Sequence, residues 1–185
     1  MIKVSKFLAR ILRHDPGSAY LRLDRNGWAD VDDVLVAISA RFGGLTASDL
    51  AELVRSNDKS RYALSPDGSR IRANQGHSID VDLGFEPMEP PALLYHGTKA
   101  DLIPRIMREG LTKGRRHHVH LSADVATALK VGGRRGGEVA VLAIRSSDMT
   151  DFLFYRSSNG VWLIEHVPPT FIGTIDRAAR STSHA

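Results

Sequence analysis

Apolar side chains in the first third of the chain recur every three or four positions, which is the spacing of amphipathic helices. The stretch 3–14 predicts one such helix, with an inner face made of Val4, Phe7, Leu8, Ile11 and Leu12. Pro16 disfavours helical geometry at Asp15, so this helix should end near His14. Arg13 and His14 are therefore expected on its last turn.

Two more helices are predicted, each with a polar residue that can cap its start. Asp30 precedes a helix that should end near Gly43-Gly44, and its inner face is formed by Val31, Val34, Leu35 and Ile38. The stretch 46–49, Thr-Ala-Ser-Asp, resembles a capping box for a third helix, which carries Leu50, Leu53 and Val54.

Alternating runs in the same half predict strands. The runs 61–64 and 70–74 flank the turn residues 66–69 and predict a β-hairpin, and the shorter run 21–23 predicts a strand before an expected core aromatic, Trp28. Three short helices followed by a hairpin form the winged-helix arrangement. That arrangement often binds nucleic acid, but a fold alone does not establish a function.

The second half of the chain predicts mainly strands. A proline-rich stretch, 84–92, precedes it and favours a stiff linker, because proline cannot join a central ladder. Strands are predicted at 93–95, 116–122, 139–144, 152–155, 161–164 and 171–175. One helix is predicted from 102 to its end at Gly110, and another at about 124–130. The apolar run 139–144 is expected at the centre of a sheet, and residues 132–137 are expected to form a flexible basic loop.

The stretch 116–122, Arg-His-His-Val-His-Leu-Ser, combines a guanidinium and three imidazoles with an alternating pattern. Because side chains alternate across a strand, Val119 and Leu121 should point into a core and leave His118, His120 and Ser122 on the other face. Such a strand is either the wall of a cleft or an exposed, histidine-rich edge.

The composition narrows the functions that these patterns could serve. The 185 residues suffice for one domain or two small ones, and the net charge of +4 permits a phosphate-rich partner without requiring one. Cysteine is absent, which excludes disulfides and thiolate metal sites. The chain contains neither a long apolar run nor the profile of a secretory signal, so a cytoplasmic protein without a membrane partner is expected.

Several common catalytic motifs do not occur in the sequence. It contains no HExxH pattern, no GxSxG elbow, no Walker loop and no GxGxxG, and no metal is expected. What remains is a set of arginines and imidazoles, namely Arg13, His14, Arg61, His96-Gly97-Thr98, Arg116 and His120. Arginine forks hold and orient oxyanions, so this set suits a substrate that already carries a phosphate.

Seven segments carry a more specific pattern. They are Leu12-Arg13-His14, Gly27-Trp28, Asp58-Lys59-Ser60-Arg61-Tyr62, IRANQGHS at 71–78, Tyr95-His96-Gly97-Thr98, HVHLS at 118–122 and SNGVWL at 158–163. In this order they resemble the NAD-dependent RNA 2′-phosphotransferases, the KptA family, along nearly the whole chain. One departure is Ile164, where the family usually has threonine after Trp-Leu.

The resemblance implies an α+β fold with two lobes. An N-terminal winged-helix RNA-binding lobe would span 1–83, a proline-rich linker 84–92, and a β-rich ADP-ribosyltransferase-like NAD-binding lobe 93–177, followed by a disordered tail at 178–185. The catalytic set that gathers on the RNA 2′-phosphate in the family is matched by Arg13, His14, Arg61 and Arg116. The NAD site is matched by His96, Gly97, Thr98, His120, Ser122 and Val161.

The implied reaction uses NAD as co-substrate and has two steps. The RNA 2′-phosphate attacks the anomeric carbon of the nicotinamide ribose and expels nicotinamide. The adjacent ribose 2″-hydroxyl then attacks the phosphorus and releases 2′-hydroxyl RNA and ADP-ribose 1″,2″-cyclic phosphate. Val161 stands where many ADP-ribosyltransferases have glutamate, which leaves that hydroxyl beside an uncharged wall. His14 would orient the phosphate or protonate the departing RNA oxygen.

Two other functions fit the same residues. One is an ADP-ribosyltransferase that caps terminal phosphates of DNA or RNA and stops after the first step. The other is a non-catalytic winged-helix protein that binds nucleic acid and senses NAD. The full Arg-His-Arg-Arg set argues against the sensor, whereas the capping enzyme would have almost the same site. Its expected partners are 2′-phosphorylated RNA, as in tRNA processing or RNA repair, and NAD, and a monomer is expected. His117 and His118 receive no role.

Overall fold

The computed structural model describes residues 2–57 and 60–175. Asp58, Lys59 and the predicted tail at 178–185 lie outside the described residues. The chain divides into two compact units. The first unit comprises Met1–Phe85, Arg115–His117 and Ser157–Asn159, and the second comprises Glu86–Gly114, His118–Arg156 and Gly160–Ala185. Helices and small antiparallel sheets make up both units, which agrees with the predicted α+β class.

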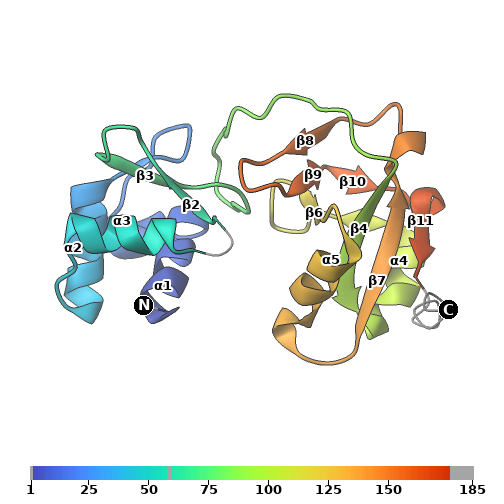
Figure 1. The fold of residues 1–185 in the computed structure, drawn as a ribbon, viewed down its shortest axis with the longest axis horizontal. Helices are drawn as coiled ribbons and strands as arrows, with labels where there is room; N and C mark the ends of the chain where they lie inside the picture. The colour runs from blue at the N-terminus through green and yellow to red at the C-terminus, as the bar shows by residue number, and fades with distance from the viewer. Residues whose placement is uncertain (1, 58–59, 176–185) are drawn as a thin grey trace, which may run out of the picture. The chain divides into compact units, whose positions relative to one another are not determined.

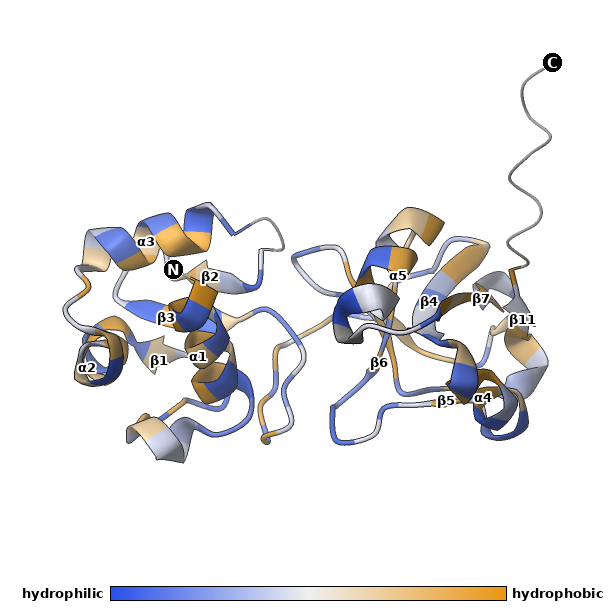
Figure 2. Cartoon of the chain, turned by 90° about the horizontal axis from the view of Figure 1, so that it is seen from below, coloured by the Kyte–Doolittle hydropathy of each residue, from blue (hydrophilic) through white to orange (hydrophobic). Residues whose placement is uncertain are grey.

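In the described part of the first unit, three α-helices pack with a three-stranded antiparallel sheet (Figure 1). Its elements are α1 (Ile2–Arg13), a 3-10 turn (Pro16–Ala19), β1 (Ala29–Asp30), α2 (Val31–Phe42), α3 (Ala47–Arg55), β2 (Tyr62–Leu64) and β3 (Arg70–Ala73). The sheet order is β1-β3-β2, and the predicted hairpin is the β2–β3 pair, in which Leu64 lies opposite Ile71. In Figure 2, α3 carries both apolar and polar bands, as an amphipathic helix should.

The predicted helix limits in this unit are confirmed by their caps. The Asp30 carboxylate accepts a hydrogen bond of 2.9 Å from the Asp32 N–H at the start of α2, and Gly43, with φ of +90°, ends that helix. Thr46 and Asp49 form the expected capping box, with side-chain bonds in both directions. Each cap satisfies backbone groups that a helix end leaves without a partner.

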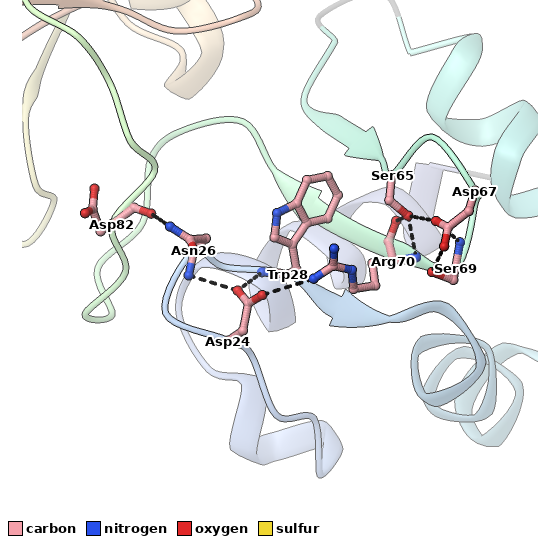
Figure 3. A network of polar contacts seen from close by, with 8 residues as sticks. All are labelled: Asp24, Asn26, Trp28, Ser65, Asp67, Ser69, Arg70 and Asp82. Atoms are coloured by element: carbon pink, nitrogen blue, oxygen red, sulfur yellow. Dashed lines mark hydrogen bonds and ion pairs between the residues drawn. The ribbon is translucent and has the colours of Figure 1, made fainter.

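Two predictions in this unit were wrong. Residues 21–23 form no strand; the Leu21 N–H donates to the Pro16 carbonyl at 3.0 Å, and β1 pairs with β3 instead. Trp28 is half-buried rather than a core residue, because it supports arginines: the guanidinium carbon of Arg72 lies 4.6 Å from its ring centroid. The Asp24 carboxylate accepts from the Trp28 N–H and pairs with Arg70, which fixes this turn (Figure 3).

Over the residues described, the second unit contains three sheets and two α-helices (Figure 1). Its strands are β4 (Leu93–Lys99), β5 (Leu111–Thr112), β6 (Val119–Leu121), β7 (Val139–Arg145), β8 (Phe154–Arg156), β9 (Trp162–Ile164), β10 (His166–Val167) and β11 (Ile172–Thr174). Its helices are α4 (Ile103–Glu109) and α5 (Val125–Gly132), with 3-10 turns at Ala100–Leu102, Gly133–Arg135, Ser146–Asp148 and Pro169–Phe171. The sheet orders are β11-β7-β4, β6-β9-β8 and β10-β5.

Strand β7 is the centre of its sheet, as its apolar run predicts, and α5 packs on the β4–β7 pair. Gly97 permits this packing: a Cβ atom at that position would lie 1.8 Å from the Ala128 carbonyl oxygen. Only a residue without a side chain allows so close an approach of helix and strand.

Other predictions for this unit are corrected in detail. The expected strand 116–122 is shortened to β6, although Val119 and Leu121 are buried as predicted. The predicted flexible loop 132–137 is wrong at its start, because Gly132 belongs to α5 and the 3-10 turn follows. Within the predicted linker 84–92, the Met88 N–H donates to the Phe154 carbonyl at 2.8 Å.

In the described part of the chain, no single helix is long and apolar enough to cross a membrane. Only α2 and α3 taken together, with a 93° bend between them, reach that length and hydropathy.

Candidate active site

The end of α1 positions the first two residues of the predicted phosphate set. Leu8, Ile11 and Leu12 are fully buried and anchor this helix in the core of the first unit. The next residue, Arg13, is half-buried, and His14 is exposed just past the helix end. The His14 N–H still donates to the Arg10 carbonyl at 2.9 Å, so the backbone there remains in the helical turn.

The segment that follows β3 holds these residues in place. The Ser78 N–H donates to the Arg13 carbonyl at 2.9 Å, and the Ser78 hydroxyl lies 2.9 Å from Nδ1 of His14. The Asn74 N–H donates to the Arg61 carbonyl at 2.9 Å, and the same carbonyl accepts a 3.3 Å bond from Arg13 Nη2. Arg13, His14 and the backbone of Arg61 therefore meet within the first unit.

The electrostatics link Arg116 to this group. Burial, Arg13, Arg116 and Arg115, in that order, lower the pKa of His14 below its ordinary value of 6.5. Although the ring is exposed by surface area, three neighbouring guanidinium charges oppose its protonation. His14 is consequently neutral near pH 7 in the free protein, inside a field that favours an anion.

Arg13, His14, Arg115 and Arg116 are called the cation group below, and His77 lies next to it. Its ring is 1% exposed, and burial followed by the charges of Arg13, His117, His14 and Arg72 lowers its pKa to about 3. The rings of His77 and His117 have centroids 6.5 Å apart. His77 is therefore a neutral imidazole at the base of the site over the whole physiological pH range.

The residues predicted for NAD lie in the second unit, where β4 and β6 bring several of them together. Tyr95 and Ser122 exchange two backbone hydrogen bonds, of 2.9 and 2.7 Å. One residue further along β4, His96 Nδ1 lies 3.0 Å from the His120 carbonyl oxygen. A carbonyl can only accept, so Nδ1 of His96 carries the hydrogen, and the neutral ring presents Nε2 as an acceptor.

The remaining predicted NAD residues have different surroundings. Val161 is half-buried and directly precedes Trp162, which lies opposite Leu121, so Val161 is at the Ser122 end of the β6–β9 pair. Thr98 is buried, and Gly97 has the packing role toward α5 described above.

Sequence reasoning missed three residues at the cation group: Ser78, His77 and Arg115. The first two belong to the segment 71–78, whose sequence is highly specific, but its pattern gives no indication of what the side chains contact. Arg115 could have been suggested by its position next to Arg116. The histidines without a predicted role also have neighbours, since His118 packs edge-on against Tyr155 with ring centroids 5.5 Å apart.

Metal ligation finds no support in the described ranges 2–57 and 60–175. They contain no group of three or more histidine, aspartate or glutamate side chains that could hold an ion. The cation group instead has the donor set of an oxyanion site, because guanidinium and imidazole N–H groups bind phosphate oxygens.

Comparisons with known proteins identify the family. A family model described as RNA 2′-phosphotransferase, Tpt1/KptA family, matches residues 1–166. The chain is 46% identical over 174 residues to a protein of Rhodopirellula baltica named "Probable RNA 2'-phosphotransferase", covering 93% of this chain and 95% of that protein. Proteins with the same name from Hahella chejuensis and Pseudomonas aeruginosa are 49% and 51% identical, and the matches cover 93% and 91% of this chain and 93% of each relative.

An α+β protein that gathers arginine and imidazole groups at the end of α1 is thus matched along most of its length by proteins named as RNA 2′-phosphotransferases. The chain belongs to the RNA 2′-phosphotransferase, Tpt1/KptA family.

Proposed function

We propose that this protein removes an internal 2′-phosphate from RNA by transferring it to NAD in two steps. Family membership supports a transferase that acts on an RNA 2′-phosphate. The observation that carries the proposal is the meeting of Arg13, His14 and the Arg61 backbone at the end of α1, within the field of Arg116.

The charge of this group fits a phosphate monoester better than a neutral substrate. Three arginines oppose protonation of His14 in the free protein. A bound phosphate dianion would offset much of this positive field and raise the pKa of His14. His14 could then give a proton to the RNA oxygen that leaves in the second step, which is the role of a general acid.

The second unit supplies residues that suit NAD. His96, with its hydrogen on Nδ1, offers Nε2 as an acceptor for a ribose hydroxyl, and His120 and Ser122 lie on the adjoining strand segment. When bound, NAD would supply an electrophilic ribose carbon with nicotinamide as leaving group, and a neighbouring hydroxyl to release the RNA. Val161 provides an apolar wall there. A carboxylate in its place would add negative charge where a phosphate must react.

The experiment is incubation of the full chain with NAD and an RNA oligonucleotide that carries one internal 2′-phosphate. Loss of the phosphate together with nicotinamide release is expected, and omission of NAD should abolish both. A stable adduct on a 5′-phosphorylated oligonucleotide, without 2′-phosphate removal, would instead identify a capping ADP-ribosyltransferase. Binding of RNA and NAD without nicotinamide release would identify a sensor.

Replacement of Arg116 by lysine tests the oxyanion site itself. Lysine keeps the charge but loses the planar fork, so turnover of the 2′-phosphorylated RNA should fall about 10²-fold, as for loss of one preorganised donor. The matched control is Arg105→Lys, because Arg105 is exposed on α4 and pairs with Glu109. Full turnover by the Arg116 variant would show that Arg116 does not belong to the phosphate site.

A further inference from the structure

The segment 71–78 is the most specific part of the sequence pattern, yet none of its residues belongs to the predicted phosphate set. In the structure its last residue makes two bonds to consecutive residues at the end of α1: backbone to Arg13 and side chain to His14, each 2.9 Å long. We propose that Ser78 is the positioning residue of His14, whose hydroxyl donates to Nδ1 and so keeps the hydrogen of the neutral ring on Nε2.

The position of His14 explains why such a contact is needed. The residue lies beyond the last residue of α1 and its side chain is exposed, so packing alone does not fix the ring. The Ser78 backbone bond to Arg13 sets where the hydroxyl is, and the hydroxyl then sets the ring orientation. A ring held in one orientation loses less entropy when it binds the phosphate.

The direction of the Ser78–His14 hydrogen bond follows from the charge state of the His14 ring. Burial and the charges of Arg13, Arg116 and Arg115 disfavour an imidazolium at His14 in the free protein. A neutral ring has one N–H. If Nδ1 carried it, Nε2 would present a lone pair, which repels phosphate oxygens. With the hydroxyl as donor, Nε2–H is the group offered to the phosphate, a consequence that rests on the proposed function.

Other residues of the segment 71–78 hold the backbone on the N-terminal side of Ser78 in place. The Asn74 amide donates to the Ser60 carbonyl at 2.6 Å, and its N–H donates to the Arg61 carbonyl. The ring of His77 is buried directly before Ser78. Both ends of the connection from β3 are therefore fixed, and the hydroxyl has little freedom to move away from His14.

The test measures the tautomer of His14 by ¹⁵N NMR of the full chain labelled in histidine, without RNA or NAD. Comparison with His14→Gln identifies the signal among the eight histidines. The wild type should show Nε2–H, and Ser78→Ala should show a mixture of tautomers with turnover reduced about tenfold. The control Ser56→Ala removes a hydroxyl that donates to the Glu52 carbonyl at the end of α3, and it should change neither quantity.

Two isosteric variants keep the test decisive if the alanine variant does not fold. Ser78→Thr retains the hydroxyl and should keep the wild-type tautomer and most of the turnover, whereas Ser78→Val has the shape of threonine without the donor and should behave like alanine. Hydrogen on Nδ1 in the wild type, or a wild-type tautomer in the alanine or valine variant, would overturn the assignment. Because the tautomer is read without substrate, it can hold even if the proposed reaction is not observed.

Discussion

Acidification is expected to destabilise the first unit through His77. The pKa of this buried ring is lowered from 6.5 to about 3, by burial first and then by the charges of Arg13, His117, His14 and Arg72. The unfolded chain takes up a proton as the pH falls below 6.5, whereas the folded chain does so only near pH 3. The stability contribution is therefore complete above pH 6.5 and is lost progressively toward pH 3.

The size of this loss in the free energy of unfolding follows from the pKa shift of His77. Since one pKa unit corresponds to about 1.4 kcal/mol, the free energy of unfolding should fall by about 2 kcal/mol at pH 5 and about 3 kcal/mol at pH 4 from this residue alone. Against a total stability of roughly 5–15 kcal/mol, such a loss is easily measured.

The assay compares urea unfolding of the wild type and His77→Gln between pH 7.5 and pH 4, with hydrogen exchange of α1 amides to report the first unit. Carboxylates such as Asp67, whose pKa is lowered to about 2 mainly by the Ser65 hydroxyl, titrate in both proteins and cancel in the difference. The wild type should lose stability more steeply than the variant. Equal pH dependence in the two proteins would refute the buried, cation-facing environment of His77.

Two further substitutions test the fold around the two predicted sites. Gly97→Ala should destabilise the second unit by about 3 kcal/mol in urea unfolding, because its Cβ would overlap the Ala128 carbonyl. The control Gly133→Ala should have little effect, because its Cβ would meet only ordinary contacts. Equal effects of the two substitutions would contradict the close approach of α5 to β4. Asp30→Ala should lower the free energy of unfolding by about 1 kcal/mol through loss of the α2 cap, while Asp33→Ala in the same first turn should cost less.

Local signals explain which elements could be predicted. The helices α2 and α3 begin at caps that a four-residue window reveals, and the hairpin is indicated by a turn between alternating runs. Strands β1, β5 and β10 have two residues each, too short for any periodicity, and exist only because another strand lies opposite. The alternation at 21–23 was misleading, because no partner strand is available to it.

In the candidate site, too, some features could be predicted from the sequence and others could not. The resemblance supplied Arg13, His14 and Arg61, and the structure brings them together through carbonyl and hydroxyl contacts. The bond between Ser78 and His14 joins residues 64 positions apart, so no local pattern could indicate it. Trp28 shows the opposite difficulty: an aromatic residue suggests a core, whereas its ring faces support Arg70 and Arg72.

Asp15, which follows His14 in the sequence, pairs with Arg10 and not with His14. Asp15 accepts a 2.7 Å bond from Arg10, and that bond is the main reason why its pKa is lowered. The charged groups that shift the pKa of His14 are all arginines, and its hydrogen-bond partner is the neutral Ser78 hydroxyl. A carboxylate bound to His14 would weaken the positive field on which the proposed phosphate site depends. The neutral Ser78 hydroxyl contacts His14 at the end of α1 without adding a negative charge beside the arginines.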